Sequence, residues 1–216
     1  MAAASPEHIT APDRLQRLVS SAVGKLAHVL AADPQRFAKP GENMNKREFV
    51  QALANGRIDV LQIFIDTMGQ IGADYCVIGG LAVNAYAEPV VSLDLDIVIA
   101  ATDTETLCEA AAQHFKVESF PHSINLNSSE SDLRIQLQTA PRYQAFIPDA
   151  KSKDVLGYQL KVASVEDVLK GKVWAYSDQQ RRMSKRQKDL VDIVRLIEAY
   201  PQLTDQVPVE IRNKFV

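Results

Sequence analysis

Two acidic residues in the segment Ser92-Leu93-Asp94-Leu95-Asp96 have the spacing of a metal site. Residues i and i+2 of a β-strand point to the same face, so Asp94 and Asp96 would lie side by side. Carboxylate oxygens are preferred ligands of hard divalent cations such as Mg²⁺. Without a cation the two carboxylates would repel each other, and one of them would be held neutral. The pattern therefore indicates a metal site; the alternative is a strand face that carries two solvated acids.

A pair of glycines, Gly79-Gly80, precedes the acidic pair and indicates a phosphate-binding turn. The pair follows the apolar run Tyr75-Cys76-Val77-Ile78, which is typical of a buried strand, and precedes a short helix expected over 81–87. Glycine allows a backbone to approach a ligand closely, and the first turn of a helix presents free N–H groups to phosphate. Together, the two motifs predict a triphosphate held beside a metal ion. The alternative for the glycines alone is a tight strand-to-helix turn.

The hydrophobic pattern predicts the elements that would position these motifs. Helical spacing of apolar residues predicts helices over about 13–31, 46–70 with a break at Asn55-Gly56, 103–115, 164–176 and 184–200. Apolar or alternating runs predict strands over 75–78, 90–100, 116–120, 133–139 and 155–162, with a polar loop over 121–131. This order of elements predicts an α/β (α+β) fold, in which a small mixed sheet has flanking helices and a helical C-terminal part.

Composition excludes several classes of protein. The 216 residues are 46% hydrophobic and 24% charged, which is ordinary for a soluble globular protein and unlike a fibrous or broadly disordered chain. No apolar run is long enough to span a membrane, and the first residues lack the pattern of a secretory signal. The two cysteines, Cys76 and Cys108, are too few for a disulfide framework. We therefore expect reduced, buried thiols in a cytoplasmic protein.

Charge is unevenly distributed along the chain. Residues 151–216 carry 13 basic and 9 acidic residues, although the whole chain has a net charge of −3. A basic C-terminal surface beside an acidic centre suits a site that holds cations together with a polyanionic ligand. The alternative is that the Lys and Arg side chains cover a solvated helix face.

Two groups of motifs resemble a known family. The segment Ile78-Gly79-Gly80-Leu81-Ala82, followed by 92–96, resembles motif I of the nucleotidyltransferase superfamily, which has a polymerase-beta-like fold. The segments 166–175 and 185–193 are similar to the Asp-x-x-x-x-Lys-x-x-Ala helix and the final Lys/Arg-x-x-Asp-x-x-Asp motif of AbiEii/AbiGii-type toxins of type IV toxin–antitoxin systems. The resemblance implies a nucleotidyltransferase core over 45–163 and a helical region over 164–216. Residues 1–44 would form an N-terminal helical arm and linker outside it.

The resemblance implies roles for the residues of the first motif. Gly79 and Gly80 would cradle the nucleotide phosphates. Asp94 and Asp96 would hold Mg²⁺, or alternatively Mn²⁺, as catalytic metal ligands. Ser92 stands where the family has a Thr or Ser and would contact the phosphates.

Roles in the helical region follow in the same way. Lys172 would contact phosphate as a point charge, and Asp189 would position Lys172 or the acceptor. The alternative for Lys172 is a solvated helix lysine. The alternative for Asp189 is a surface pair with Lys185, matched by Lys188 with Asp192, since both pairs have i,i+4 spacing.

The sequence departs from the family pattern at two positions. Val90 stands where the family often has an arginine. Gln136 stands where active relatives have a third carboxylate on a later strand, and glutamine is neutral. Asp132 or Glu130 would supply that carboxylate if the strand register differed from the one we expect.

These patterns predict a Mg²⁺-dependent nucleotidyltransferase that moves NMP from an NTP to an acceptor. The resemblance implies an RNA acceptor, such as tRNA, or a protein hydroxyl, and a role as the toxin of a pair with a cognate antitoxin. One alternative is a nucleotide-binding protein that Gln136 has deprived of transfer activity. Another is a helical interaction protein without enzymatic activity, in which the acidic pair is incidental. No membrane partner is expected.

Overall fold

The computed structural model describes residues 46–56, 58–90 and 92–214, so the helix expected over 13–31 and the arm over 1–44 lie outside the described residues. Seven strands form one sheet in the order β3-β4-β5-β2-β1-β7-β6. The strands are β1 (Tyr75–Ile78), β2 (Asp94–Ile99), β3 (Lys116–Phe120), β4 (Ser123–Ser128), β5 (Ser131–Gln138), β6 (Lys151–Val155) and β7 (Tyr158–Val162). Strand β2 is parallel to β5 and β1 is parallel to β7, whereas the other neighbours are antiparallel. The sheet is therefore mixed, as the sequence predicts.

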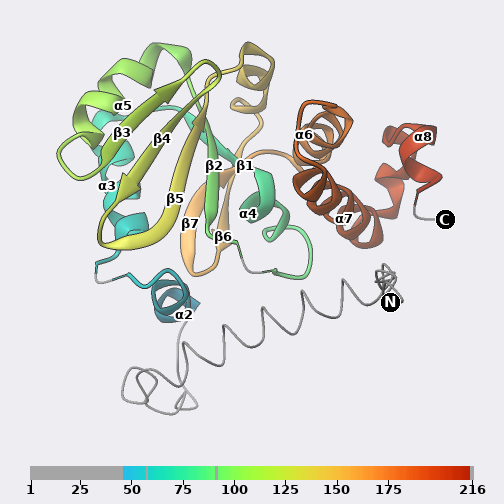
Figure 1. The fold of residues 1–216 in the computed structure, drawn as a ribbon, viewed down its shortest axis with the longest axis horizontal. Coiled ribbons are helices and arrows are strands. Elements are labelled where there is room, and N and C mark those ends of the chain that lie inside the picture. The colour runs from blue at the N-terminus through green and yellow to red at the C-terminus, as the bar shows by residue number, and fades with distance from the viewer. Residues whose placement is uncertain (1–45, 57, 91, 215–216) are drawn as a thin grey trace, which may run out of the picture. The chain divides into compact units, whose positions relative to one another are not determined.

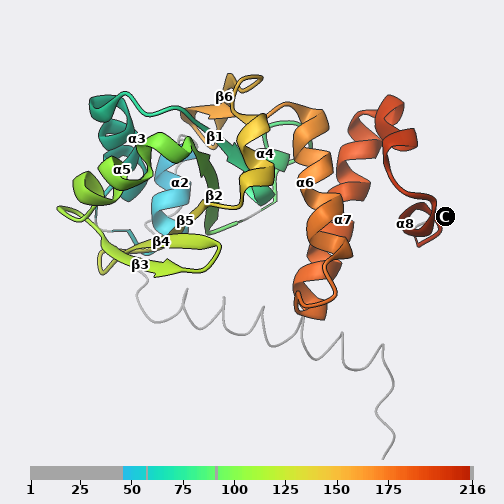
Figure 2. The ribbon, with the colours of Figure 1, turned by 90° about the horizontal axis from the view of Figure 1, so that it is seen from above.

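Helices flank the sheet on both sides. The α-helices are α2 (Lys46–Leu53), α3 (Val60–Ile71), α4 (Gly79–Val83), α5 (Thr104–Ala111), α6 (Val165–Ser177), α7 (Met183–Ala199) and α8 (Val209–Arg212), and short 3-10 helices cover Ala101–Asp103, Pro141–Phe146 and Pro201–Gln206. Figures 1 and 2 show α3 and α5 on one side of the sheet and α4, α6 and α7 on the other. This confirms the expected α/β fold with a helical C-terminal part. Among the described helices, none combines the length and apolar character needed to cross a membrane.

Alternation along β2 separates the core from the face that carries the acidic pair. Leu95 and Ile97 are fully buried and lie opposite Ile135 and Leu137 of β5. Asp94 and Asp96 fall on the other face and are partly exposed. Because side chains of a strand alternate with period two, burial of the leucine and isoleucine residues fixes the direction of both carboxylates.

Capping residues and a break in the chain mark the helix ends. Gly72 follows α3 in the left-handed conformation with φ 64°, and its N–H caps the carbonyls of the last turn. Ser164 precedes α6 and its hydroxyl accepts a hydrogen bond from the backbone N–H of Asp167 at 3.1 Å. Asn55 and Gly56 separate α2 from α3. The caps therefore define where α3 ends and where α6 begins.

Three expectations about the elements are wrong. Strand β4 (Ser123–Ser128) lies within the region expected to be a polar loop. The single strand expected over 155–162 is a hairpin, because Leu156 and Gly157 both have positive φ and form the tight turn between β6 and β7. Helix α4 begins at Gly79 and ends at Val83, earlier than the predicted 81–87.

Both cysteines are free thiols, as the sequence predicts. Cys76 of β1 is fully buried, whereas Cys108 of α5 is only partly buried. Burial raises the pKa of the Cys76 thiol to about 12, so it stays protonated at neutral pH and is chemically inert.

Replacement of Ser164 by alanine tests the cap of α6. Ser164→Ala removes the hydroxyl that accepts from Asp167 N–H, and we expect it to lower the free energy of unfolding by about 1 kcal/mol in urea titrations. Ser177→Ala, at the exposed end of the same helix, should change it by less than about 0.5 kcal/mol. Equal losses in the two variants would show that the cap does not stabilise α6.

Candidate active site

Asp94 and Asp96 form the floor of a cavity of about 720 Å³. Side chains of β2 and β5 line one side of this cavity, and side chains of α6, α7 and the segment between them line the other. The parallel pairing of β2 with β5 places Arg134 beside Asp94 and Gln136 beside Asp96, and both line the cavity. The acidic pair therefore lies where the sheet and the C-terminal helices meet.

The glycine turn packs directly against the acidic pair. Gly79 has φ 72°, a conformation that residues with a Cβ rarely adopt, and a Cβ at this position would collide with the carboxylate of Asp96. A Cβ on Gly80 would lie 3.4 Å from the hydroxyl oxygen of Ser92, so Ser92 is the neighbour of the second glycine. The hydroxyl of Ser92 in turn donates to the carbonyl of Asp94 at 3.4 Å. The structure thus brings together all five residues that the first motif singles out.

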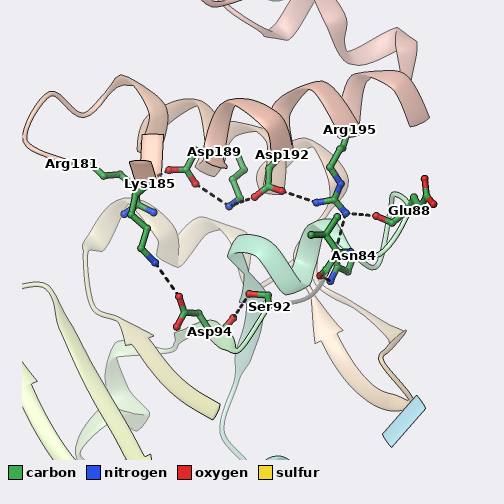
Figure 3. Close-up of polar contacts among 11 residues, drawn as sticks. Asn84, Glu88, Ser92, Asp94, Arg181, Lys185, Asp189, Asp192 and Arg195 are labelled. Atoms are coloured by element: carbon green, nitrogen blue, oxygen red, sulfur yellow. Dashed lines mark hydrogen bonds and ion pairs between the residues drawn. The ribbon is translucent and has the colours of Figure 1, made fainter. Parts of the chain in front are cut away.

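Two basic side chains neutralise Asp94. Arg134 Nη2 lies 2.9 Å from Asp94 Oδ1. Figure 3 shows the second contact, in which Lys185 Nζ of α7 lies 3.2 Å from Asp94 Oδ2. Burial alone would raise the pKa of Asp94, but the charges and hydrogen bonds of Arg134 and Lys185 outweigh burial and lower it. Asp94 is therefore ionised at neutral pH. The Nε of Arg134 is buried and has no hydrogen-bond partner among the described residues.

Asp96 has a different environment from Asp94. Among the described residues, its side chain makes no hydrogen bond and no ion pair. Burial raises the pKa of Asp96, and the charge of Lys172 offsets this effect only in part. Although Asp96 is partly exposed, its carboxylate is largely removed from water and unpaired, which is unfavourable for folding, and a bound cation would relieve that cost.

Lys172 lies in a cluster of buried charges between α6 and α7. Its side chain is only 8% exposed, and its Nζ lies 3.0 Å from Asp189 Oδ1 and 2.7 Å from Asp192 Oδ2. Burial lowers the pKa of Lys172, but the two carboxylates outweigh it and hold the pKa above its usual value. The interpretation of Lys172 as a solvated helix lysine is therefore wrong, while its contact with phosphate stays a prediction.

Asp189 and Asp192 are also buried, and their partners differ from the i,i+4 alternative. Asp189 Oδ2 lies 2.7 Å from Arg181 Nε, and Asp192 Oδ1 lies 2.7 Å from Arg195 Nη1. Lys185 reaches Asp94 instead of Asp189. The spacing of Lys and Asp along α7 suggested surface pairs, but both aspartates turn inward to meet Lys172.

The cavity is rich in basic side chains, most of which the sequence patterns did not single out individually. The basic residues that line the cavity are Arg134, Arg142, Lys172, Arg181, Arg182 and Lys185. The basic character of the C-terminal region was the signal that pointed to them. Basic side chains and two carboxylates around one cavity suit a polyanion that a metal ion links to the carboxylates.

The metal-binding capacity of the site rests on two carboxylates. Within 46–56, 58–90 and 92–214, no group of three or more His, Cys, Asp and Glu residues is arranged to hold a metal ion. Gln136 occupies the β5 position beside Asp96. Neither Asp132 nor Glu130 lines the cavity, and Asp132 accepts a hydrogen bond from Asn55 instead. The register therefore leaves a neutral amide where a third carboxylate would stand.

Comparison with solved structures identifies the fold. The antibiotic-resistance factor ANT(2'')-Ia in complex with adenylyl-2''-tobramycin matches with a TM-score of 0.55 and 12% identity, over 73% of this chain and 97% of that chain. The solution structure of the same factor matches with a TM-score of 0.54 and 12% identity, over 72% and 90%. The lincosamide antibiotic adenylyltransferase LnuA matches with a TM-score of 0.46 and 14% identity, over 63% and 95%.

These similarities show that the chain has the nucleotidyltransferase fold. No protein-family model matches the sequence, and no curated protein matches it. The assignment of this chain to a class of proteins therefore depends on its fold. Any inference about its chemistry depends on the residues of the site.

Replacement of Gly79 by alanine tests the turn beside Asp96. Gly79→Ala should lower the free energy of unfolding by about 2 kcal/mol, because the new Cβ is strained at positive φ and collides with the Asp96 carboxylate. Gly69→Ala is the matched control, since Gly69 lies exposed in α3 with open space around it and should stabilise the protein by about 0.5–1 kcal/mol. Equal and small effects in urea unfolding would contradict the close approach of Gly79 to Asp96.

Proposed function

We propose that this chain is a Mg²⁺-dependent nucleotidyltransferase that transfers NMP from an NTP to an acceptor hydroxyl. In this reaction the acceptor oxygen forms a bond to the α-phosphorus, the bond from that phosphorus to the bridging oxygen breaks, and pyrophosphate leaves. The observation that carries the proposal is the position of Asp94 and Asp96 at the base of one cavity, against the Gly79 turn and opposite a basic wall. The nucleotidyltransferase fold supports it.

The residues present fit a divalent cation bound to the acidic pair. Asp96 is unpaired among the described residues, and Asp94 lies two positions away on the same face. A bound Mg²⁺ would supply charge neutralisation at the triphosphate and polarise the phosphorus–oxygen bonds. Lys185 contacts Asp94 Oδ2, so we expect this lysine to move from the carboxylate to the phosphates when nucleotide binds. Mg²⁺ would then replace the ammonium group of Lys185 as the partner of Asp94, and the carboxylate would stay paired throughout.

The other residues of the cavity would bind and orient the triphosphate. Gly79 lines the cavity without a side chain, and Gly80 and Ser92 lie beside it in the same turn, so a phosphate could approach the backbone at Gly79. Lys172 lines the cavity from α6, and Asp189 holds its ammonium group in place. These positions support a role of Lys172 as a positioned charge near the phosphates and of Asp189 as its support.

An RNA end, such as that of tRNA, or a protein hydroxyl would serve as acceptor. The basic residues between α6 and α7, among them Arg181 and Arg182, suit a polyanion and so favour RNA. By its resemblance to AbiEii/AbiGii-type toxins, the chain would act as the toxin of a type IV system and be neutralised by a cognate antitoxin.

A second candidate function is nucleotide binding with little or no transfer. Gln136 pairs with Asp96 in the sheet and supports this candidate, because a neutral amide is a weaker metal ligand than a carboxylate. Loss of the third carboxylate would impair the activation of the attacking hydroxyl more than the binding of the triphosphate.

Thermal and chemical unfolding with nucleotide tests the proposal. An NTP with Mg²⁺ at about 100 times its dissociation constant should stabilise the wild-type chain by about 2.7 kcal/mol. Asp96→Asn should remove this stabilisation because it removes a metal ligand. The same change should stabilise the protein without nucleotide at pH 7: the pKa of Asp96 is raised by folding, so its charge opposes folding as pH rises through the unfolded-state pKa.

Asp205→Asn is the control for this experiment. Asp205 lies outside the cavity with its side chain 95% exposed, so its loss should leave the nucleotide effect intact. If none of the four NTPs stabilised the wild-type chain in the presence of Mg²⁺, the proposed function would be wrong.

Replacement of Gln136 by aspartate separates the two candidate functions. Gln136→Asp places a carboxylate beside Asp96, and transfer of labelled NMP should increase by about 10²–10⁴-fold if activation of the nucleophile is what the wild type lacks. Gln138→Asp is the matched control, because it lies on the same strand face but pairs with Val98. Strong transfer by the wild type with no gain in Gln136→Asp would show that the reaction does not use this position.

A further inference from the structure

The loop over 84–90, between α4 and the segment that enters β2, is closed by one side chain. The amide of Asn84 donates from Nδ2 to the carbonyl of Val90 at 2.7 Å, and its Oδ1 accepts from the N–H of Val90 at 3.0 Å. Both backbone groups of Val90 are therefore satisfied by Asn84, as they would be by a neighbouring strand. Ser92 and Asp94 lie a few residues further along the chain, so the position of Val90 limits where they can enter the site.

An arginine of α7 holds this closed loop from outside. Arg195 Nη2 donates to Asn84 Oδ1 at 2.9 Å and also to the carbonyl of Glu88. The other terminal nitrogen, Nη1, donates to Asp192 Oδ1 at 2.7 Å (Figure 3). One planar guanidinium thus contacts the loop at two points while an ion pair fixes its own orientation.

The ion pair that orients Arg195 belongs to the buried cluster around Lys172. Asp192 binds Arg195 through Oδ1 and Lys172 through Oδ2, and Lys172 binds Asp189 in turn. The side chain of Arg195 is 14% exposed and does not line the cavity. Polar contacts therefore run without a break from the cavity wall to the loop that precedes the acidic pair.

We infer that Arg195 is a positioning residue of the nucleotide site. It acts through Asn84 to hold residues 84–90 in one conformation, and this conformation sets the approach of Ser92 and Asp94 to the cavity. The effect on nucleotide rests on the proposed function, whereas the effect on the loop does not. A lysine cannot replace this arginine, because a single ammonium group cannot reach Asp192, Asn84 and Glu88 in the same fixed geometry.

Hydrogen–deuterium exchange of the full chain tests the effect on the loop. Arg195→Lys keeps a positive charge near Asp192, so it should keep the fold, yet exchange in peptides that cover 84–90 should accelerate by about tenfold or more. Asn84→Ala should have the same effect, and combining both changes should add little to either one. Arg186→Gln is the matched control: Arg186 also lies on α7 and donates to a backbone carbonyl, that of Tyr176, outside the cavity.

The two possible results for the loop decide the inference. Faster exchange over 84–90 in Arg195→Lys and Asn84→Ala, with wild-type exchange in Arg186→Gln, supports it. Unchanged exchange in Arg195→Lys overturns it, whether or not the wild type binds nucleotide.

A second measurement tests the consequence for the site. The dissociation constants of ATP, GTP, CTP and UTP with Mg²⁺ should rise by about tenfold in Arg195→Lys and stay unchanged in Arg186→Gln. Absence of NTP binding in the wild type, together with faster loop exchange in Arg195→Lys, would refute the proposed function and support the role of Arg195 in the loop. Wild-type binding with equal affinities in Arg195→Lys would overturn the role of Arg195 in the site.

Discussion

The C-terminal half of the structure depends on the ion pairs that the buried ammonium group of Lys172 makes with two carboxylates. A charge removed from water costs several kcal/mol unless partners compensate for it, and Lys172 has two partners from α7, Asp189 and Asp192. Arg181 and Arg195 each add a further cation, one at either end of the cluster, so that both buried carboxylates have a second partner. Removal of Lys172 would leave each buried carboxylate without the partner that α6 supplies. The cluster therefore fixes how α6 and α7 pack, and with them the helical wall of the cavity.

The opposite wall is fixed by sterics more than by charge. Gly79 adopts a positive φ, and the absence of a side chain there leaves space for the carboxylate of Asp96. Asp94 and Asp96 are chemically identical and only two residues apart, yet their surroundings give them different properties. Arg134 and Lys185 lower the pKa of Asp94, while burial raises the pKa of Asp96. Asp94 is thus charged at neutral pH, and Asp96 gains most from the arrival of a cation.

The local and periodic features of this chain could be predicted from the sequence. The common face of Asp94 and Asp96 followed from the alternation of leucine and isoleucine, and the position of Gln136 beside them followed from the family resemblance. Strand β4 was missed because its outward positions are Ser and Asn, residues that are also typical of loops. Its two buried residues, Ile124 and Leu126, were too few to indicate a strand without the neighbouring β3 and β5.

The ion-pair network around Lys172 could not be predicted from the sequence. Lys172 and its carboxylate partners are 17 or more residues apart in the sequence, and only the packing of α6 on α7 brings them together. The basic residues were visible as a compositional bias, but their individual partners were not. Spacing along α7 indicated pairs within one helix, whereas burial made pairs between elements more favourable.

The two outer strands of the sheet limit how other molecules can engage it. β3 and β6 have no neighbour on one side among the described strands, and each begins with an exposed lysine, Lys116 and Lys151. Charged side chains at such an edge oppose the addition of a further strand, because a pairing partner would have to bury them. A protein that binds this chain is thus expected to contact a sheet face or the C-terminal helices, and copies of the chain are protected from joining edge to edge into aggregates.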